Sequence, residues 1–298
     1  MDKPKHRTWR LRRKVLDNNK ESESSHPHKS VTDDTGKVRL LSWDEIEPWQ
    51  QHNRYIIRSY RPATSSYRQS IGSLKYVHNQ TVNIYSHILG FAAFAVSSWF
   101  IYNAFAARYE TARAMDLFVL GAFFLGLFTC LLLSASFHTF GNHSDSIYHS
   151  FLVLDMVGIV FLIIGSFYPG VYYGFYCEPV LAYIYWAMVS EAPLFVSGIN
   201  TQSLQITVFG AGAIIVCLIP KFRHKSWRPL RTVMFVSMGL SGIMPMAHAA
   251  IKFGIPQARR HMGWAWYIGE GIFYIGGAGL YAVSLILCYL WCRCSDIL

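Results

Sequence analysis

Charged residues are scarce in this sequence. Asp, Glu, Lys and Arg make up 15% of the 298 residues, whereas a soluble globular domain carries roughly 25%. With 52% apolar residues and a mean hydropathy of +0.24, this deficit excludes an ordinary soluble domain. Cysteine is also scarce. The six cysteines begin at Cys130 and lie mostly within apolar stretches, so we expect no disulfide framework.

Positive charge is concentrated towards the amino terminus. Residues 1–78 hold 16 of the 27 Lys and Arg residues, and the net charge is +10. Because these residues flank apolar runs, positive-inside bias and anionic lipid explain them, and we expect no nucleic-acid partner. Residues 1–38 are predicted to be a disordered basic tail. Residues 39–80 are interpreted as a cytoplasmic interfacial segment, because Trp and Tyr alternate there with Arg, as in a short amphipathic helix at a membrane surface.

Long apolar runs fill most of the remaining chain. Each is long enough to cross the ~30 Å hydrocarbon core of a bilayer as a helix. The predicted spans are Val82–Phe105, Leu117–Phe140, Phe151–Tyr173, Val180–Ile219, Val233–Ile251 and Trp264–Leu290. The stretch Lys221–Arg231 carries five further Lys and Arg residues and, like the amino terminus, is expected on the cytoplasmic side. We therefore predict an all-α polytopic membrane protein whose helical bundle occupies residues 81–282.

Three polar residues interrupt two of these runs. Ser134 and His138 lie four residues apart, so they share one face of a helix, and Asp155 lies within the next span. Ionisable residues inside a membrane are costly, so they indicate a functional site by default. Two interpretations remain open: His138 is a metal ligand, or it joins helices through hydrogen bonds.

Several motifs resemble those of a known family. In chain order they are Trp43-Asp44-Glu45, Tyr60-Arg61-Pro62, His78–Gly90, Ser134 with His138, Leu154–Ile159, Gly165–Pro169, Tyr172–Cys177, Gly239–His248 and Gly276–Ala282. This sequence resembles the progestin and adipoQ receptors, a family that includes the adiponectin receptors and the haemolysin III-like proteins. Within this family it looks most like the fungal members. The resemblance covers residues 40–188 and 206–282.

The resemblance implies a seven-transmembrane bundle with a cytoplasmic amino terminus, in the plasma membrane or an endomembrane. It also implies a signalling receptor linked to lipid and zinc homeostasis, with zinc-dependent hydrolysis of ceramide-type amides as its proposed reaction. His138 matches a zinc ligand, Asp155 matches the residue that holds the zinc-bound water, and Ser134 lies one turn from the ligand, so Asp155 and Ser134 would be catalytic. The implied partners are membrane lipids, such as a ceramide- or sterol-like ligand, and an extracellular protein ligand.

The sequence departs from the family in places that bear on this zinc site. Gln80 stands where the family usually has glutamate. After Ala282 the family continues into a seventh helix with two zinc-binding histidines, whereas residues 283–298 here form an atypical tail without histidine. We therefore expect an incomplete zinc site and an inactive hydrolase. The alternative function is a non-catalytic membrane regulator in which His138 and Asp155 only join helices.

Residues 189–205 are a suspected insert within the fourth span. Without them, 23 uncharged residues remain, which suffice for a single crossing. The insert and the atypical tail both begin with Val-Ser. The nucleotides that usually begin an intron can be translated as this dipeptide. One hypothesis is that both segments are translated from unspliced introns, and the rival is a genuine variant with a re-entrant fourth segment.

The remaining polar residues of the spans are given structural roles. His87 and His248 are expected to pack in the helical core. His78, Asn79 and Thr81 are expected to cap the start of the first span, because side chains of this kind satisfy the free N–H groups of a helix.

Overall fold

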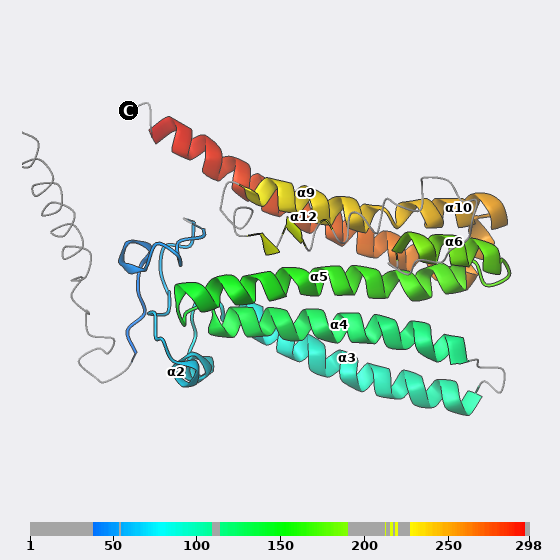
Figure 1. Ribbon diagram of the computed structural model, residues 1–298, viewed down its shortest axis with the longest axis horizontal. Coiled ribbons are helices and arrows are strands. Elements are labelled where there is room, and N and C mark those ends of the chain that lie inside the picture. Colours follow the sequence, from blue (N-terminus) through cyan, green and yellow to red (C-terminus); the bar gives the residue numbers. More distant parts are fainter. Residues whose placement is uncertain are drawn as a thin grey trace, which may run out of the picture.

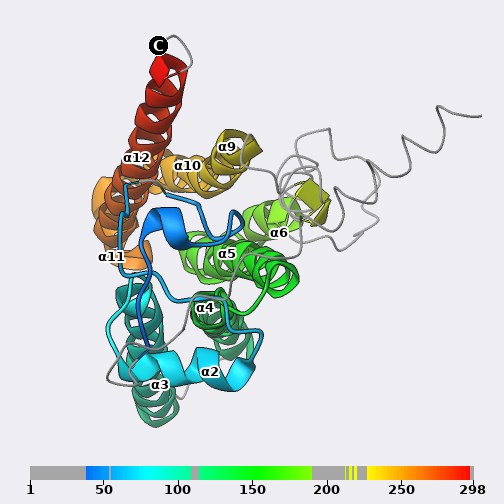
Figure 2. The same cartoon turned by 90° about the vertical axis from the view of Figure 1, so that its left-hand side faces the viewer.

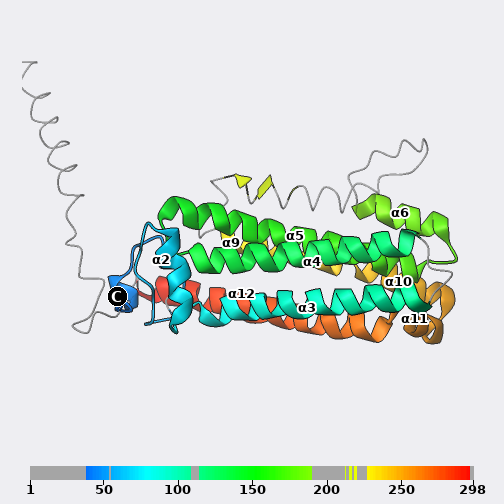
Figure 3. The same ribbon diagram turned by 90° about the horizontal axis from the view of Figure 1, so that it is seen from below.

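Long helices dominate the architecture. The computed structural model describes residues 38–53, 55–108, 114–189 and 227–295, together with residues 212, 215, 216, 218 and 219. The longest helices are α3 (Thr81–Arg108), α4 (Ala114–Phe140), α5 (Asp145–Gly174) and α12 (Trp264–Ser295). They run along the longest axis of the molecule (Figures 1 and 3). The stretches long and apolar enough to cross a membrane are Thr81–Phe105, Ala114–Phe140, Asp145–Gly174 and Pro229–Phe253. The prediction of a helical membrane protein is confirmed.

Helices α4 and α5 pack against each other through glycine. A Cβ atom at Gly126 of α4 would lie 2.4 Å from the carbonyl oxygen of Phe161, and one at Gly165 of α5 would lie 2.8 Å from that of Ala122. Both distances are shorter than a side chain tolerates. Small residues in membrane helices allow such close backbone contact, and here they bring the two helices that carry His138 and Asp155 together.

The predicted span Val233–Ile251 consists of two helices. These are α9 (Arg228–Leu240) and α10 (Ile243–Phe253), which are separated by a turn at Ser241 and Gly242. Pro245 is the third residue of α10, and proline is tolerated in the first turn of a helix but not in its interior. Both helices lie within Pro229–Phe253, which is long and apolar enough to cross a membrane, so the predicted span contains a turn.

Shorter helices lie at the end of the bundle opposite residues 38–80 (Figure 1). They are α6 (Pro179–Val189) and α11 (Ile255–Met262). Together with α5 and α10 they bury an apolar cluster that consists of Val171, Phe175, Ala182, Ala249 and Ala258. Most of the suspected insert 189–205, and of the predicted fourth span beyond α6, lies outside the described residues.

We call residues 38–80 the collar. This segment crosses one end of the long helices, as the end-on view in Figure 2 shows. It contains a 3-10 turn, η1 (Trp43–Glu45), the short helix α2 (Tyr67–Gly72) and a second 3-10 turn, η2 (Ser73–Lys75). An antiparallel bridge joins Leu41 to Tyr60.

The prediction of an amphipathic helix in the collar is wrong for most of its length. Between η1 and α2 the chain is irregular, because Pro48 and Pro62 interrupt helical hydrogen bonding. Two of its side chains, those of Tyr60 and Arg61, are buried, whereas Tyr55 and Tyr67 are exposed. The collar is therefore a folded cover over the helix ends.

Candidate functional site

Arg61 of the collar binds the carboxyl-terminal end of α4. Its Nη2 donates to the carbonyl oxygen of His138 at 2.6 Å, and its Nη1 donates to the carbonyl oxygen of Thr139 at 2.9 Å and to Ser73 Oγ at 2.8 Å. Burial lowers the pKa of Arg61 to about 10, so the guanidinium remains charged at neutral pH. It satisfies carbonyl groups that a helix end leaves free, and its charge complements the negative end of the helix dipole.

The turn between α4 and α5 is also bound to the collar. Asn142 Nδ2 donates to the carbonyl oxygen of Pro62 at 3.0 Å. The backbone N–H groups of Thr64 and Ser65 donate to the carbonyl oxygens of Asn142 and His143, at 3.0 and 2.9 Å. The collar thus fixes both the last turn of α4 and the start of α5.

The His138 ring has a partner in the last residue of the collar, immediately before α3. Its Nδ1 lies 2.9 Å from Gln80 Oε1, and Asn83 Nδ2 donates to the same oxygen at 2.8 Å. Because this oxygen accepts both bonds, His138 Nδ1 carries the hydrogen and Nε2 keeps its lone pair. Gln80, which the sequence singled out only as a departure from the family, therefore orients the imidazole.

Asp155 lies on α5 beside residues of two other helices. Ser134 on α4 and His87 on α3 are both close enough to the Asp155 carboxylate to interact with it electrostatically. The centroids of the His87 and His138 rings are 6.1 Å apart. All three predicted site residues therefore gather where α3, α4 and α5 meet.

His87 is the member of this cluster that sequence reasoning assigned to packing. Its Nδ1 is buried and has no hydrogen-bond partner among the described residues. The sequence did contain a pattern that places it here: His87 follows Gln80 by seven residues, which corresponds to two helical turns and hence to the same face of α3.

His78 and Thr81 bond to backbone N–H groups that precede α3, so their predicted roles as helix-capping residues stay a prediction. The backbone N–H of His78 donates to Thr81 Oγ1 at 2.8 Å, and His78 Nδ1 accepts from the N–H of Gln80 at 3.1 Å. His248, in contrast, lies at the far end of the bundle, where Tyr185 Oη is 2.7 Å from its Nδ1. It packs there against Phe175, in agreement with its predicted core position.

A polar cavity of about 230 Å³ lies between the collar and His138. Its amide side chains are those of Gln50, Asn53, Asn79, Gln80, Asn83 and Asn142. Two of their oxygens, Gln50 Oε1 and Asn142 Oδ1, are buried and accept no hydrogen bond in the described part of the chain. Buried polar atoms normally have a partner. Since both are acceptors, a group that donates hydrogen bonds would satisfy them.

The described side chains do not fit a zinc ion. Zinc sites use three or four protein ligands, and in the described ranges no three His, Cys, Asp or Glu side chains come together in a way that could hold a metal. His143 Nδ1 lies 3.1 Å from Ser144 Oγ. His248 contacts Phe175, which lies 20 residues beyond Asp155, or about 30 Å along α5 at ~1.5 Å per residue.

These features define a class: a polytopic helical membrane protein with a polar cluster where three helices meet beneath a folded collar. The haemolysin-III related family model matches residues 75–206 and 199–286, so the chain belongs to this family.

Receptor-type proteins from animals and yeast are similar to this chain. It is 35% identical over 247 residues to progestin and adipoQ receptor-like protein 1 of Caenorhabditis elegans, covering 82% of this chain and 52% of that protein. It is 35% identical over 247 residues to the adiponectin receptor protein of Drosophila melanogaster, covering 83% and 51%. It is also 35% identical over 248 residues to the ADIPOR-like receptor IZH2 of Saccharomyces cerevisiae, covering 82% and 72%. The chain thus spans about half the length of the two animal relatives. The recognition of the progestin and adipoQ receptor family is confirmed.

Proposed function

We propose that this protein is a membrane receptor or regulator that responds to lipid. In this proposal the site at His138 and Asp155 binds the polar group of a ceramide- or sterol-like lipid. The family to which the chain belongs supports the receptor class. In this proposal the amino terminus and the collar are cytoplasmic, so the site opens towards the cytoplasmic leaflet. The basic residues before the first span, and those of Lys221–Arg231, support this orientation.

The observation that carries the proposal is the set of unsatisfied polar atoms around His138. Gln50 Oε1 and Asn142 Oδ1 are buried beside the cavity, and His87 Nδ1 is buried beside Asp155, all without a hydrogen-bond partner in the described part of the chain. A lipid with a hydroxyl group and an amide N–H offers the donors that these atoms lack. Ligand sites in membrane bundles of this kind combine apolar walls with a few such convergent polar groups.

Binding of a fluorescent short-chain ceramide to the full chain in nanodiscs tests this proposal. We expect His138→Ala and Asp155→Asn each to weaken binding by about tenfold, which is the loss of one good polar contact in a buried site. His149→Ala is the matched control, because His149 lies on α5 but is exposed and pairs with Asp145. Equal affinity of the wild type and both site variants would refute the proposed site.

A second candidate function is zinc-dependent hydrolysis of a ceramide-type amide. The pairing of Ser134 with Asp155 beside His138 favours it, whereas the donor set of the described residues disfavours it. Elemental analysis of purified protein, combined with a fatty-acid release assay, separates the two candidates. One zinc ion per chain and release that is lost in Asp155→Asn would establish the hydrolase. Binding of ceramide without zinc and without release would establish the non-catalytic receptor.

A further inference from the structure

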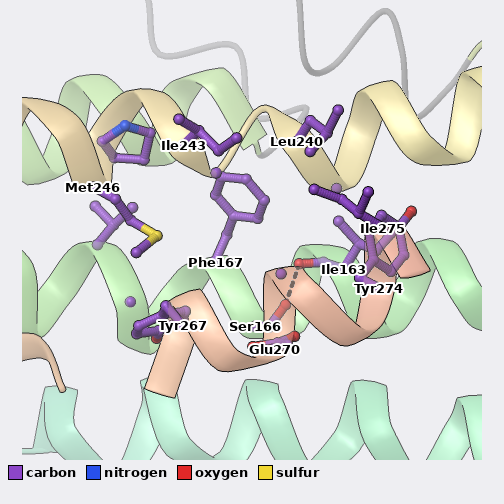
Figure 4. A pocket seen from close by; sticks show the side chains of 16 residues that line it. Ile163, Ser166, Phe167, Leu240, Ile243, Met246, Tyr267, Glu270, Tyr274 and Ile275 are labelled. Atoms are coloured by element: carbon purple, nitrogen blue, oxygen red, sulfur yellow. Dashed lines mark hydrogen bonds between the residues drawn. The ribbon is translucent and has the colours of Figure 1, made fainter. Parts of the chain in front are cut away.

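A second cavity, of about 170 Å³, lies between α5, α9, α10 and α12 (Figure 4). Its walls are largely apolar and include Phe167 on α5, Ile243 and Met246 on α10, and Ile275 on α12. Cavities of about 150 Å³ are large enough to take up benzene. The space therefore accommodates the first part of an alkyl chain or a small ring.

One wall of this cavity carries a carboxylate, that of Glu270 on α12. Glu270 is the only charged residue among the described residues that line the cavity. It was not singled out from the sequence, although a glutamate inside the apolar run Trp264–Leu290 is a pattern that could have revealed it. An ionisable side chain within a membrane-spanning helix indicates a functional site unless a partner neutralises it.

The described residues provide Glu270 with no such partner. Their ion pairs join Arg39 to Glu45, His149 to Asp145 and Lys252 to Glu178. Three hydroxyl groups line the cavity with it. Tyr274 Oη donates to the carbonyl oxygen of Phe235 at 2.6 Å, and Ser166 Oγ donates to that of Ile163 at 2.9 Å. The third hydroxyl, that of Tyr267, makes no hydrogen bond to Glu270 in the described part of the chain. Glu270 is exposed, so its carboxylate is free to pair with a donor or a cation that enters the cavity from outside.

This cavity is separate from the site at His138. Ser166, which lines it, lies 11 residues beyond Asp155, or about 16 Å along α5 at ~1.5 Å per residue. Glu270 lies six residues into α12 from Trp264, or about 9 Å from the helix end that faces away from the collar. A ligand head group at this depth would belong to the membrane leaflet opposite the collar.

We propose that this cavity binds a cationic amphiphile, with its protonated amine paired to Glu270 and its alkyl chain among Phe167, Ile243 and Met246. Charge complementarity selects this class of ligand. A fatty acid would place a second negative charge beside Glu270, and a neutral lipid would leave the carboxylate without a cation. This proposal is independent of lipid binding at His138.

Thermal unfolding of the detergent-purified full chain with dodecylamine, dodecanol or dodecanoate tests the proposal. The three probes share one chain length and differ in the charge of the head group. We expect dodecylamine to raise the melting temperature in a saturable way and the other two to have little effect. Equal shifts with dodecanol, or no shift with dodecylamine, would overturn the proposal.

Two variants and a matched control locate the binding site. Glu270→Gln keeps the shape of the side chain and removes the charge, and we expect it to weaken dodecylamine binding by about tenfold or more. Gly271→Leu introduces a side chain at a position whose Cβ meets nothing within 4 Å, so the fold is retained while the cavity is filled and binding is lost. Glu178→Gln removes a carboxylate outside the cavity, and its binding should match the wild type. If Glu270→Gln or Gly271→Leu binds dodecylamine as the wild type does, the site is not this cavity.

Discussion

Arg61 and His138 are joined by a hydrogen bond from Nη2 of the arginine to the backbone carbonyl oxygen of the histidine, 2.6 Å long, although they are 77 residues apart. The bond connects the collar to the helix that carries the candidate site. Any displacement of the collar would thus release the last turn of α4, and with it the His138 ring. The collar is therefore part of the site rather than an appendage to the bundle.

Replacing Arg61 should destabilise the protein strongly. Arg61→Ala removes three charge-assisted hydrogen bonds and leaves the carbonyl groups of His138 and Thr139 buried without a donor, which should cost about 3 kcal/mol or more. We expect a fall in melting temperature of about 5–10 °C. Arg58→Ala is the control, because Arg58 is exposed in the same segment. Similar melting temperatures for the two variants would contradict the capping role of Arg61.

The contact between Gln80 and His138 can be measured by a double-mutant cycle. Gln80→Leu and His138→Leu each remove one side of the 2.9 Å bond, and the double variant removes both. We expect a coupling free energy of about 1 kcal/mol, because a buried hydrogen bond contributes that much and the lone partner is left unsatisfied. Melting temperatures of the four proteins give the coupling. Strictly additive effects would show that Gln80 does not orient the imidazole.

Glycine at the contact between α4 and α5 should be required for packing. An alanine at Gly126 places its Cβ 2.4 Å from the carbonyl oxygen of Phe161, which belongs to the backbone and cannot move aside, so the two helices must separate. Gly121→Ala on the same helix is the matched control, since its Cβ would meet nothing within 4 Å. We expect Gly126→Ala to lower the melting temperature and Gly121→Ala to leave it unchanged or raise it slightly. The reverse order would refute the close helix contact.

Stability of the collar should depend on pH through His78. Burial, together with the positive charge of Arg61, lowers the pKa of His78 from 6.5 to about 4. The unfolded chain therefore takes up a proton as the pH falls through about 6.5, while the folded chain does so only near about 4. The contribution of His78 is fully present above pH 6.5 and is lost progressively between these two values.

The His78→Asn variant isolates this effect. Asparagine retains a side-chain acceptor for the backbone N–H of Gln80 but does not titrate. Between about pH 7.5 and about pH 5, the melting temperature of the wild type should fall further than that of His78→Asn. Equal losses would mean that other groups account for the acid sensitivity.

Hydropathy predicted α3, α4 and α5 well, because each is a long run of mainly apolar residues. It did not predict the break between α9 and α10, since the residues at that turn, Ser241 and Gly242, scarcely alter the mean hydropathy of the window. The collar could not be predicted either. Its structure depends on contacts between residues far apart in the chain, such as those of Arg61 with the end of α4.

The candidate site could be predicted only in part, because contacts between distant residues complete it. Ser134, His138 and Asp155 stand out because they are polar within apolar runs. His87 and Gln80 occur near the polar start of α3, where helix capping explains such residues equally well. Only the packing of α3 against α4 reveals that the rings of His87 and His138 lie 6.1 Å apart and that Gln80 reaches Nδ1 of His138.

The proposed function is tested most directly by crosslinking the full chain in nanodiscs to a photoactivatable short-chain ceramide, with the diazirine next to the head group, and mapping the labelled peptides. We expect labelling on α3 near His87, on α4 near His138 and on α5 near Asp155, with loss of labelling in Asp155→Asn and on competition with unlabelled ceramide. Labels confined to other helices, or labels that neither competitor nor variant reduces, would contradict lipid binding at this site.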